Sequence, residues 1–290
     1  MGLQRAAVAS SVISGAVILA GVIAWASSPG GAEIGGMPVM VLCAAIAFVV
    51  QWFAFLPAYW KQTERFYDLV GSLTYVLVTS VALLASRPTD ARSAILGLLV
   101  FIWASRLGSF LFRRVRSAGS DPRFDDIKPS ASRFLVAWTL QGLWVFLTLC
   151  AALAAITTTS PSALGLLDAS GILVWAIGFA IEVVADRQKS QSRMANPGEF
   201  VHTGLWAWSR HPNYFGEIVL WLGVALIAAS TLHGWQWITM ISPVFVVFLL
   251  TRVSGIPLLE KRADERWGDY ESYRTYKART PILVPRPPRR

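Results

Sequence analysis

Charged residues are scarce in this sequence. Only 15% of its 290 residues are Asp, Glu, Lys or Arg, whereas soluble globular proteins contain about 25%. Hydrophobic residues make up 54%, Trp occurs 13 times, and the mean hydropathy is +0.51. This composition excludes an ordinary soluble domain and indicates an integral membrane protein.

Cysteine and histidine are also rare. Cys43 and Cys150 lie inside apolar runs without the spacing of metal ligands, which argues against disulfides and a cysteine metal site. His202, His211 and His233 are scattered, so we expect no histidine metal site. The sequence also lacks the glycine-rich dinucleotide and P-loop motifs, H-E-x-x-H and the nucleophile elbow. A nucleotide would have to be held by helix ends and side chains within a bundle.

Long apolar runs recur along the chain. Each has about 18 to 23 residues, enough to cross a hydrocarbon core of roughly 30 Å. They predict an all-α, polytopic transmembrane helix bundle of eight spans, with seven as the nearest alternative. We expect the first run to be retained as a helix, because it lacks a convincing signal-peptide cleavage site. The runs lie near residues 7–26, 38–58, 68–86, 93–112, 133–155, 166–185, 213–230 and 235–255.

The net charge of +9 is unevenly distributed. With eight spans, 23 of the 26 Lys and Arg residues fall on one side of the membrane, Arg87 and Arg92 fall on the other, and Arg106 lies inside a span. Basic residues accumulate in cytoplasmic loops, so this pattern predicts that both termini are cytoplasmic. The charge is explained by topology and does not require nucleic acid as a partner. The longer loops of the basic side can form one vestibule.

Several polar residues fall within the predicted spans, where an ionisable side chain costs a few kcal/mol or more and normally has a partner or a function. For Arg106, snorkelling to the cytoplasmic interface and a buried ion pair or ligand contact both remain possible. The polar residues concerned are Gln51, Arg106, Gln141, Glu182 and Glu217.

Polar chemistry concentrates in "WAWSRHPNYFGEIVLW", residues 206–221. Asn213 follows Pro212 and is predicted to cap the helix that begins there. Tyr214 and Glu217 follow Asn213 at helical spacing, so the three side chains lie along one side of that helix. A capping and packing network and a ligand contact both explain this arrangement.

A second polar segment, "DRQKSQSR", is predicted to continue the sixth helix into the cytoplasm. Asp186 and Lys189 are then neighbours on one helix face, as are Lys189 and Arg193. One interpretation is a solvated basic face. The other is a phosphate clamp, in which Lys189 and Arg193 supply charge and Arg210 adds a bidentate fork.

The segment "GEFVHTGLWAWSRHPNYFGEIVLWLGVAL" resembles the C-terminal region of the steroid 5-alpha-reductase and sterol C14-reductase superfamily, and most closely its bacterial branch of uncharacterised, DUF1295-like membrane proteins. "ADRQK" upstream and "LLEKRADERWGDYESYRTYKARTP" with "ILVP" downstream fit the same pattern in the same order, and "TERFYDLVGSLTY" and "RLGSFLFRR…DPRF" resemble the N-terminal half of that branch. The resemblance spans about residues 51–285. R-H-P-x-Y alone is less specific, because membrane isoprenylcysteine and phospholipid methyltransferases share it.

The resemblance implies a division of the chain and a cofactor. Residues 1–60 would form N-terminal transmembrane helices, and residues 61–290 a reductase-like membrane domain in the bacterial inner membrane, with a cofactor-binding region at about 180–285. The cofactor would be NADPH, bound at the cytoplasmic face. The matching positions are Asp186, Gln188, Lys189, Arg193, Arg210, His211, Asn213 and Tyr214, with Glu260, Lys261, Tyr270 and Tyr273 as softer matches.

The sequence departs from the steroid reductases at two substrate positions. Their Glu before a Leu-Pro dipeptide, which contacts the substrate carbonyl, is Phe55 here, and their Tyr ahead of an Arg is Trp103. The resemblance therefore implies a reductase that transfers hydride to a polarised carbon–carbon double bond of a hydrophobic, steroid-, isoprenoid- or lipid-like substrate, with a different acid completing protonation. The candidates for catalytic roles are Tyr67, Asp68, Tyr75 and Arg106.

Two other classes of function remain open from the residues. A membrane methyltransferase using S-adenosylmethionine would need less charge directed at phosphate, because that cofactor carries none. A lipid- or sterol-binding membrane protein without catalytic activity would be consistent with Phe55 and Trp103. The expected partners are a hydrophobic small molecule and membrane lipids.

Overall fold

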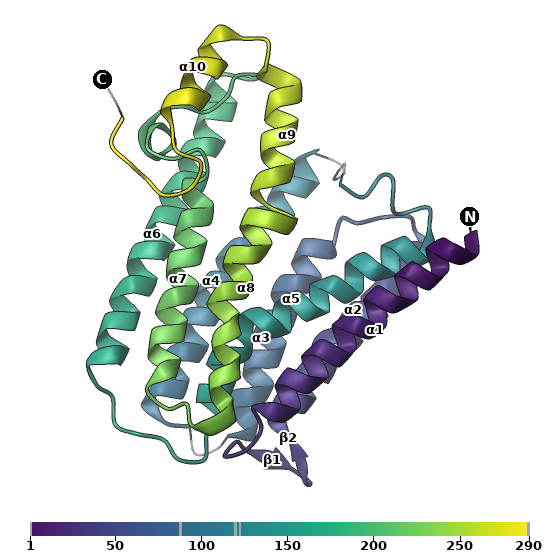
Figure 1. The fold of residues 1–290 in the computed structure, drawn as a ribbon, viewed down its shortest axis with the longest axis vertical. Coiled ribbons are helices and arrows are strands. Elements are labelled where there is room, and N and C mark those ends of the chain that lie inside the picture. The colour runs from purple at the N-terminus through teal and green to yellow at the C-terminus, as the bar shows by residue number, and fades with distance from the viewer. Residues whose placement is uncertain (1, 87–88, 119–120, 122, 289–290) are drawn as a thin grey trace. The chain divides into compact units, whose positions relative to one another are not determined.

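The computed structural model describes residues 2–86, 89–118, 121 and 123–288, and its regular secondary structure is almost entirely helical (Figure 1). The all-α prediction is therefore confirmed. The elements are α1 (Gly2–Ala26), β1 (Glu33–Ile34), β2 (Met37–Pro38), α2 (Val39–Trp60), α3 (Tyr67–Ala85), α4 (Ala91–Ala118), α5 (Ala131–Thr157), α6 (Leu166–Ala195), the 3-10 helix η1 (Gly204–Ala207), α7 (Pro212–Ala229), the 3-10 helix η2 (Gly234–Met240), α8 (Ile241–Phe248), the π-helical turn η3 (Leu249–Val253), α9 (Ile256–Trp267) and α10 (Glu271–Arg279).

Within these described residues, eight helical segments are long and apolar enough to cross a membrane, as the sequence predicted. The protein is an integral membrane protein. The last segment is longer than expected and runs from Gly234 to Trp267. It is not one regular helix, because η2, α8, η3 and α9 follow one another within it.

The chain divides into two compact units. Unit 1 contains residues 1–165 and 227–242, and unit 2 contains residues 166–226 and 243–290. In unit 1, helix α5 is buried along its second half and packs against α2 (Figure 1). Gly142 permits this approach, because a Cβ atom there would lie 2.9–3.2 Å from Phe48 and Ala47.

Two of the polar residues predicted at membrane depth join the helices of unit 1. The Gln51 side-chain amide donates to the Thr74 hydroxyl at 2.8 Å, and the Gln141 amide donates to the Tyr67 carbonyl at 3.1 Å. Arg92 is buried and donates to the carbonyls of Ser162 and Ala163. Its predicted companion on that side, Arg87, lies outside the described residues.

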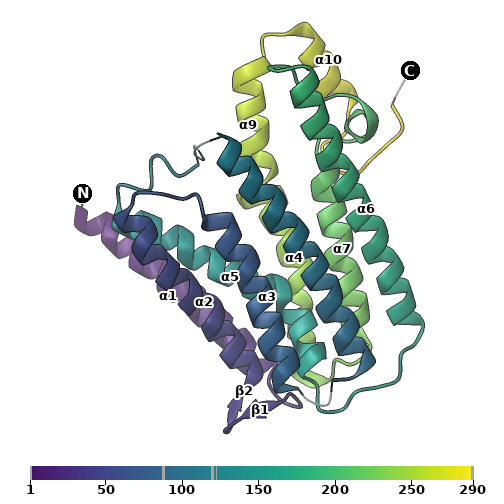
Figure 2. The same ribbon diagram turned by 180° about the vertical axis from the view of Figure 1, so that it is seen from behind.

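In unit 2, α6 and α7 lie side by side (Figures 1 and 2) and touch through their backbones. A Cβ at Gly216 would stand 2.6 Å from the Gly178 carbonyl oxygen, and one at Gly223 would stand 2.5 Å from the Trp175 nitrogen. Small residues at such crossings are typical of membrane helix pairs. This contact brings the C-terminal half of α6 beside the start of α7, where the predicted cofactor residues lie.

Candidate functional site

A cluster of charged side chains in unit 2 centres on Glu260 of α9. Its carboxylate contacts the Arg210 guanidinium, the His211 Nε2 atom at 2.8 Å and the Lys277 ammonium at 3.6 Å. Lys277 also contacts Asp264 at 2.5 Å. Residues separated by about fifty positions in the sequence therefore meet at one carboxylate.

The protonation of His211 follows from this geometry. Burial lowers the pKa of His211, and the hydrogen bond and negative charge of Glu260 offset part of that effect. The neutral ring must donate through Nε2, because a carboxylate can only accept. Its Nδ1 atom is then an acceptor, and it has no hydrogen-bond partner among the described residues.

Asn213 joins α7 to α6, but it does not cap α7. Helix α7 begins at Pro212, and the Phe215 N–H donates to the His211 carbonyl, so Asn213 already lies inside the first turn. Its amide nitrogen donates instead to the Asp186 carboxylate at 3.2 Å. The predicted capping role of Asn213 was wrong because proline occupies the first helical position and shifts Asn213 into the helix.

The helix α6 continues to Ala195, as predicted, and its polar end anchors the segment before α7. The Gln188 side-chain oxygen accepts from the Leu205 N–H at 2.9 Å, and the Lys189 ammonium lies 4.7 Å from the centre of the Trp206 ring. Gly204 has φ +62°, and a Cβ there would meet Gln188 at 2.5 Å. Lys189 is thus held against an indole at this site, whereas Arg193 is exposed on the last turn of α6.

Helix α10 adds Tyr273 to the cluster. Tyr273 is buried, and its hydroxyl donates to Asp264 at 3.4 Å. Burial, reinforced by neighbouring carboxylates, raises the pKa of Tyr273 to about 12, so it stays protonated at neutral pH. The other two softer matches lie outside this cluster: Lys261 pairs with Glu265 on the exposed side of α9, and Tyr270 is 60% exposed.

Three neighbouring residues carry buried polar atoms that have no hydrogen-bond partner within the described part of the chain. They are the Arg210 Nε donor, the His211 Nδ1 atom and the Asn213 side-chain oxygen. Buried polar atoms are hydrogen-bonded in most proteins. One donor and two acceptors of the R-H-P-N segment (residues 210–213) are thus without a hydrogen-bond partner in the described residues.

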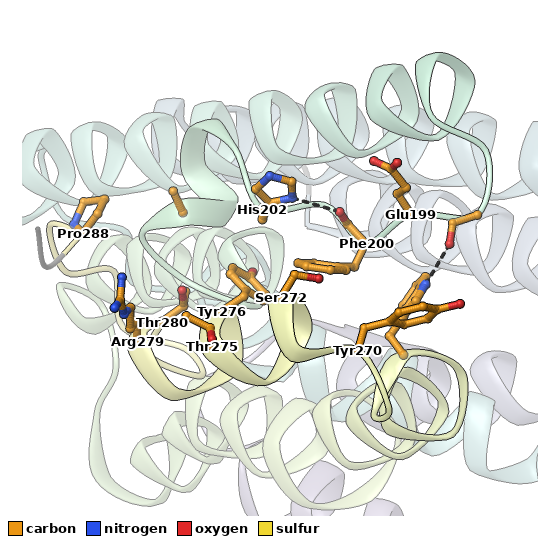
Figure 3. Close-up of a pocket in the computed structure, with 13 residues that line it drawn as sticks. Glu199, Phe200, His202, Tyr270, Ser272, Thr275, Tyr276, Arg279, Thr280 and Pro288 are labelled. Atoms are coloured by element: carbon orange, nitrogen blue, oxygen red, sulfur yellow. Dashed lines mark hydrogen bonds between the residues drawn. The ribbon is translucent and has the colours of Figure 1, made fainter.

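A groove of about 690 Å³ lies nearby in unit 2 (Figure 3). Its aromatic walls include Phe200, Trp267, Tyr270 and Tyr276, and Arg279 also lines it. Of these residues, only Tyr270 was predicted from the sequence. The others were missed because they come from separate segments that the fold brings together, and no spacing rule connects Phe200 with α10.

The four catalytic candidates lie in unit 1. Tyr67 is packed against Phe124 and Trp138, and its hydroxyl donates to the Ala137 carbonyl at 2.8 Å. Asp68 lies 3.7 Å from Arg114 and 3.6 Å from Arg123. The proton of Tyr67 is thus engaged by the backbone.

Tyr75 and Arg106 have aromatic neighbours. So do Phe55 and Trp103, the two positions at which the sequence differs from the steroid reductases. Tyr75 packs edge-on against Trp103 with ring centres 4.9 Å apart, and the Arg106 guanidinium lies 5.5 Å from the centre of the Phe110 ring. Phe55 stacks on Tyr59 at 5.6 Å. All twelve proposed cofactor residues therefore belong to unit 2, while the proposed catalytic residues belong to unit 1.

A comparison with protein-family models identifies the family of this chain. A family model described as "Protein of unknown function (DUF1295)" matches residues 54–280, which is most of the chain. The chain belongs to the DUF1295 family. The match begins just before Phe55 and ends at Thr280, so it includes every proposed cofactor-binding and catalytic residue.

A curated relative supports the steroid-reductase resemblance. The DUF1295 protein is 32% identical over 123 residues to 3-oxo-5-alpha-steroid 4-dehydrogenase 1 of Bos taurus. The matched segment covers 40% of this chain and 42% of that relative. No solved structure matches the chain significantly. The predicted membership of the steroid reductase-like superfamily is confirmed.

The lowered pKa of His211 predicts a pH-dependent stability. A histidine has an ordinary pKa of about 6.5 when unfolded, so the unfolded chain takes up protons first as the pH falls. The contribution of neutral His211 is present above about pH 6.5 and is lost as the pH falls through its lower folded pKa. We expect the melting temperature in detergent to drop less between about pH 7.5 and 5.5 in His211→Gln than in wild type. Equal drops in the two proteins would contradict a buried neutral His211.

Proposed function

We propose that this DUF1295 protein is a membrane reductase that uses NADPH to deliver hydride to a polarised carbon–carbon double bond of a hydrophobic substrate. The observation that carries the proposal is the set of orphaned buried atoms at Arg210, His211 and Asn213. A donor and two acceptors in adjacent residues fit a ligand that itself donates and accepts hydrogen bonds, as a carboxamide and a ribose do.

The residues of unit 2 fit NADPH in charge as well as in hydrogen bonding. Arg210 is a planar guanidinium suited to phosphate oxygens, and its charge is balanced by Glu260, which also orients His211. Lys189, held over Trp206, adds positive charge on the adjoining helix. Bound NADPH would supply the hydride. The part of this chain is to hold the cofactor, to fix the ring of His211 and to exclude water around it.

Completing the reduction after hydride transfer requires an acid within reach of the carbon that becomes negatively charged. We propose that Asp68, Tyr75 or Arg106 has this role or polarises the substrate. The Tyr67 hydroxyl donates a hydrogen bond to the Ala137 carbonyl. Tyr75→Phe and Asp68→Asn are the variants that test this assignment once a substrate is known. Loss of turnover with unchanged NADPH affinity is expected for the residue that acts.

The reaction is tested by incubating the purified protein in detergent with NADPH and a panel of hydrophobic alkenes and enones. We expect a product that has gained two hydrogens, one of them derived from NADPH labelled with deuterium at the transferring carbon. A parallel incubation with S-adenosylmethionine in place of NADPH that yields a methylated product would identify a methyltransferase. Absence of either product, together with tight sterol binding, would favour a binding protein.

We also propose an orientation in the membrane, from the distribution of the basic residues. The basic residues at 113–133 belong to unit 1 and those of the tail belong to unit 2, and the positive-inside rule places both in the cytoplasm of a bacterial cell. We expect cysteines introduced at Arg116 and Arg274 to be labelled only after the inner membrane is permeabilised. Labelling of one of them in intact spheroplasts would remove a span from this topology.

A further inference from the structure

The groove in unit 2 has the size of a small-molecule site. Its volume of about 690 Å³ falls within the roughly 300–1,000 Å³ typical of ligand pockets. It runs between the segment 198–207 and helix α10, and Figure 3 shows Tyr270 at one end and Arg279 at the other. Helix α10 connects the groove with the R-H-P-N segment. Tyr276 lines the groove, and the adjacent Lys277 contacts Glu260, the carboxylate that Arg210 and His211 also contact.

One end of the groove is built from aromatic rings held in fixed positions. The ring of Phe200 lies 5.3 Å from that of Tyr276 and 6.2 Å from that of Trp267. The Trp267 indole donates to the Gly198 carbonyl at 2.7 Å, and the Tyr276 hydroxyl donates to the Trp206 carbonyl at 2.8 Å. Walls fixed in this way suit a planar ring, because little side-chain entropy is lost when a ring stacks on aromatic side chains that are already held in place.

The other end of the groove is cationic. Arg279 is the last residue of α10, and none of the hydrogen bonds or ion pairs of the described residues engages its side chain. Thr280 lies beside it, whereas Glu199 lies toward the aromatic end (Figure 3). A guanidinium binds phosphate oxygens in a bidentate fork, so an anionic group is favoured at this end and disfavoured near Glu199.

We propose that this groove binds the adenosine 2′-phosphate end of NADPH, with the adenine among Phe200, Trp267 and Tyr270 and the 2′-phosphate on Arg279. The inference rests on the proposed function, and it assigns the discrimination between NADPH and NADH to Arg279. The R-H-P-N segment then holds another part of the same cofactor. None of Phe200, Trp267 and Arg279 belongs to the positions that the family resemblance implies.

The test compares Arg279→Gln with Arg274→Gln, a matched change in the same helix at a residue paired with Glu271 and outside the groove. Binding of NADPH, NADH, adenosine 2′,5′-bisphosphate and AMP is measured by titration of the full-length protein in detergent. Loss of a charge-assisted contact to phosphate should weaken NADPH and the bisphosphate about ten- to a hundredfold. NADH and AMP should bind Arg279→Gln as they bind wild type, and Arg274→Gln should bind all four as wild type does.

The outcomes separate the inference from the proposed function. If wild type binds NADPH and Arg279→Gln binds it equally well, the groove assignment is overturned and the reductase proposal stands. If wild type binds the bisphosphate but not NADPH, and Arg279→Gln loses that binding, the groove is a nucleotide site and the reductase proposal fails. Binding of neither molecule would overturn both. Phe200→Leu, which keeps an apolar side chain, should weaken AMP as well as NADPH.

Discussion

Arg210→Ala is expected to weaken NADPH binding by about 1.5–3 kcal/mol, which corresponds to roughly a ten- to hundredfold rise in Kd. The reason is the loss of a charge-assisted donor at a position where the guanidinium Nε has no partner in the described residues. Lys189→Met should have a comparable effect through the loss of charge, while its unbranched side chain keeps the packing against Trp206. The measurement is a titration of NADPH against each purified variant.

The control for this experiment concerns Glu260, which loses an ionic partner in Arg210→Ala. Arg210→Lys keeps the charge near Glu260 but removes the planar fork, so it should preserve the melting temperature and still lose part of the affinity. Thermal unfolding of each variant separates a binding defect from a folding defect. Unchanged NADPH affinity in correctly folded Arg210→Ala and Lys189→Met would rule out their proposed role at phosphate.

Little or no turnover of 3-oxo-Δ4 steroids is expected, even though NADPH binds. An enone carbonyl needs a hydrogen-bond donor where negative charge develops, and loss of such a donor typically costs on the order of 10²–10³ in rate. Phe55 has no donor, and Trp103 has only an indole N–H. Both rings are packed in unit 1, Phe55 on Tyr59 and Trp103 against Tyr75.

The steroid prediction is measured as NADPH oxidation with testosterone-like and progesterone-like substrates, followed by identification of the products. The matched control is a more apolar alkene, which does not depend on a carbonyl donor and should be the better substrate. Efficient 5-alpha reduction of either steroid would show that another donor occupies the place of the missing Glu and Tyr.

The membrane architecture could be predicted from the sequence because the length of an apolar run is set by the thickness of the bilayer. All eight spans were located, and α6 extends to Ala195, which is the condition under which Asp186, Lys189 and Arg193 are neighbours on one helix. The irregular last span was not foreseen. Its π-helical turn at Leu249–Val253 contains Thr251 and Arg252 at the end of the apolar run, and this composition does not reveal the backbone hydrogen bonding.

The composition of the candidate site could be predicted only in part. The motif pointed to Arg210, His211 and Asn213, but periodicity relates neighbours on one helix and carries no information on partners from distant helices. The convergence of Arg210 and His211 on Glu260 and the bond from Asn213 to Asp186 depend on packing between helices. The groove around Phe200 depends on the fold of the tail in the same way.

The central claim is that the R-H-P-N segment of unit 2 holds NADPH. Its most direct test is a titration of the wild-type protein in detergent with NADPH, followed by competition with S-adenosylmethionine, beside a variant carrying His211→Ala and Asn213→Ala together. The account predicts saturable NADPH binding that S-adenosylmethionine does not displace and that the double variant loses while it remains folded. Binding of S-adenosylmethionine in place of NADPH, or NADPH affinity that is equal in the wild type and the folded double variant, would contradict it.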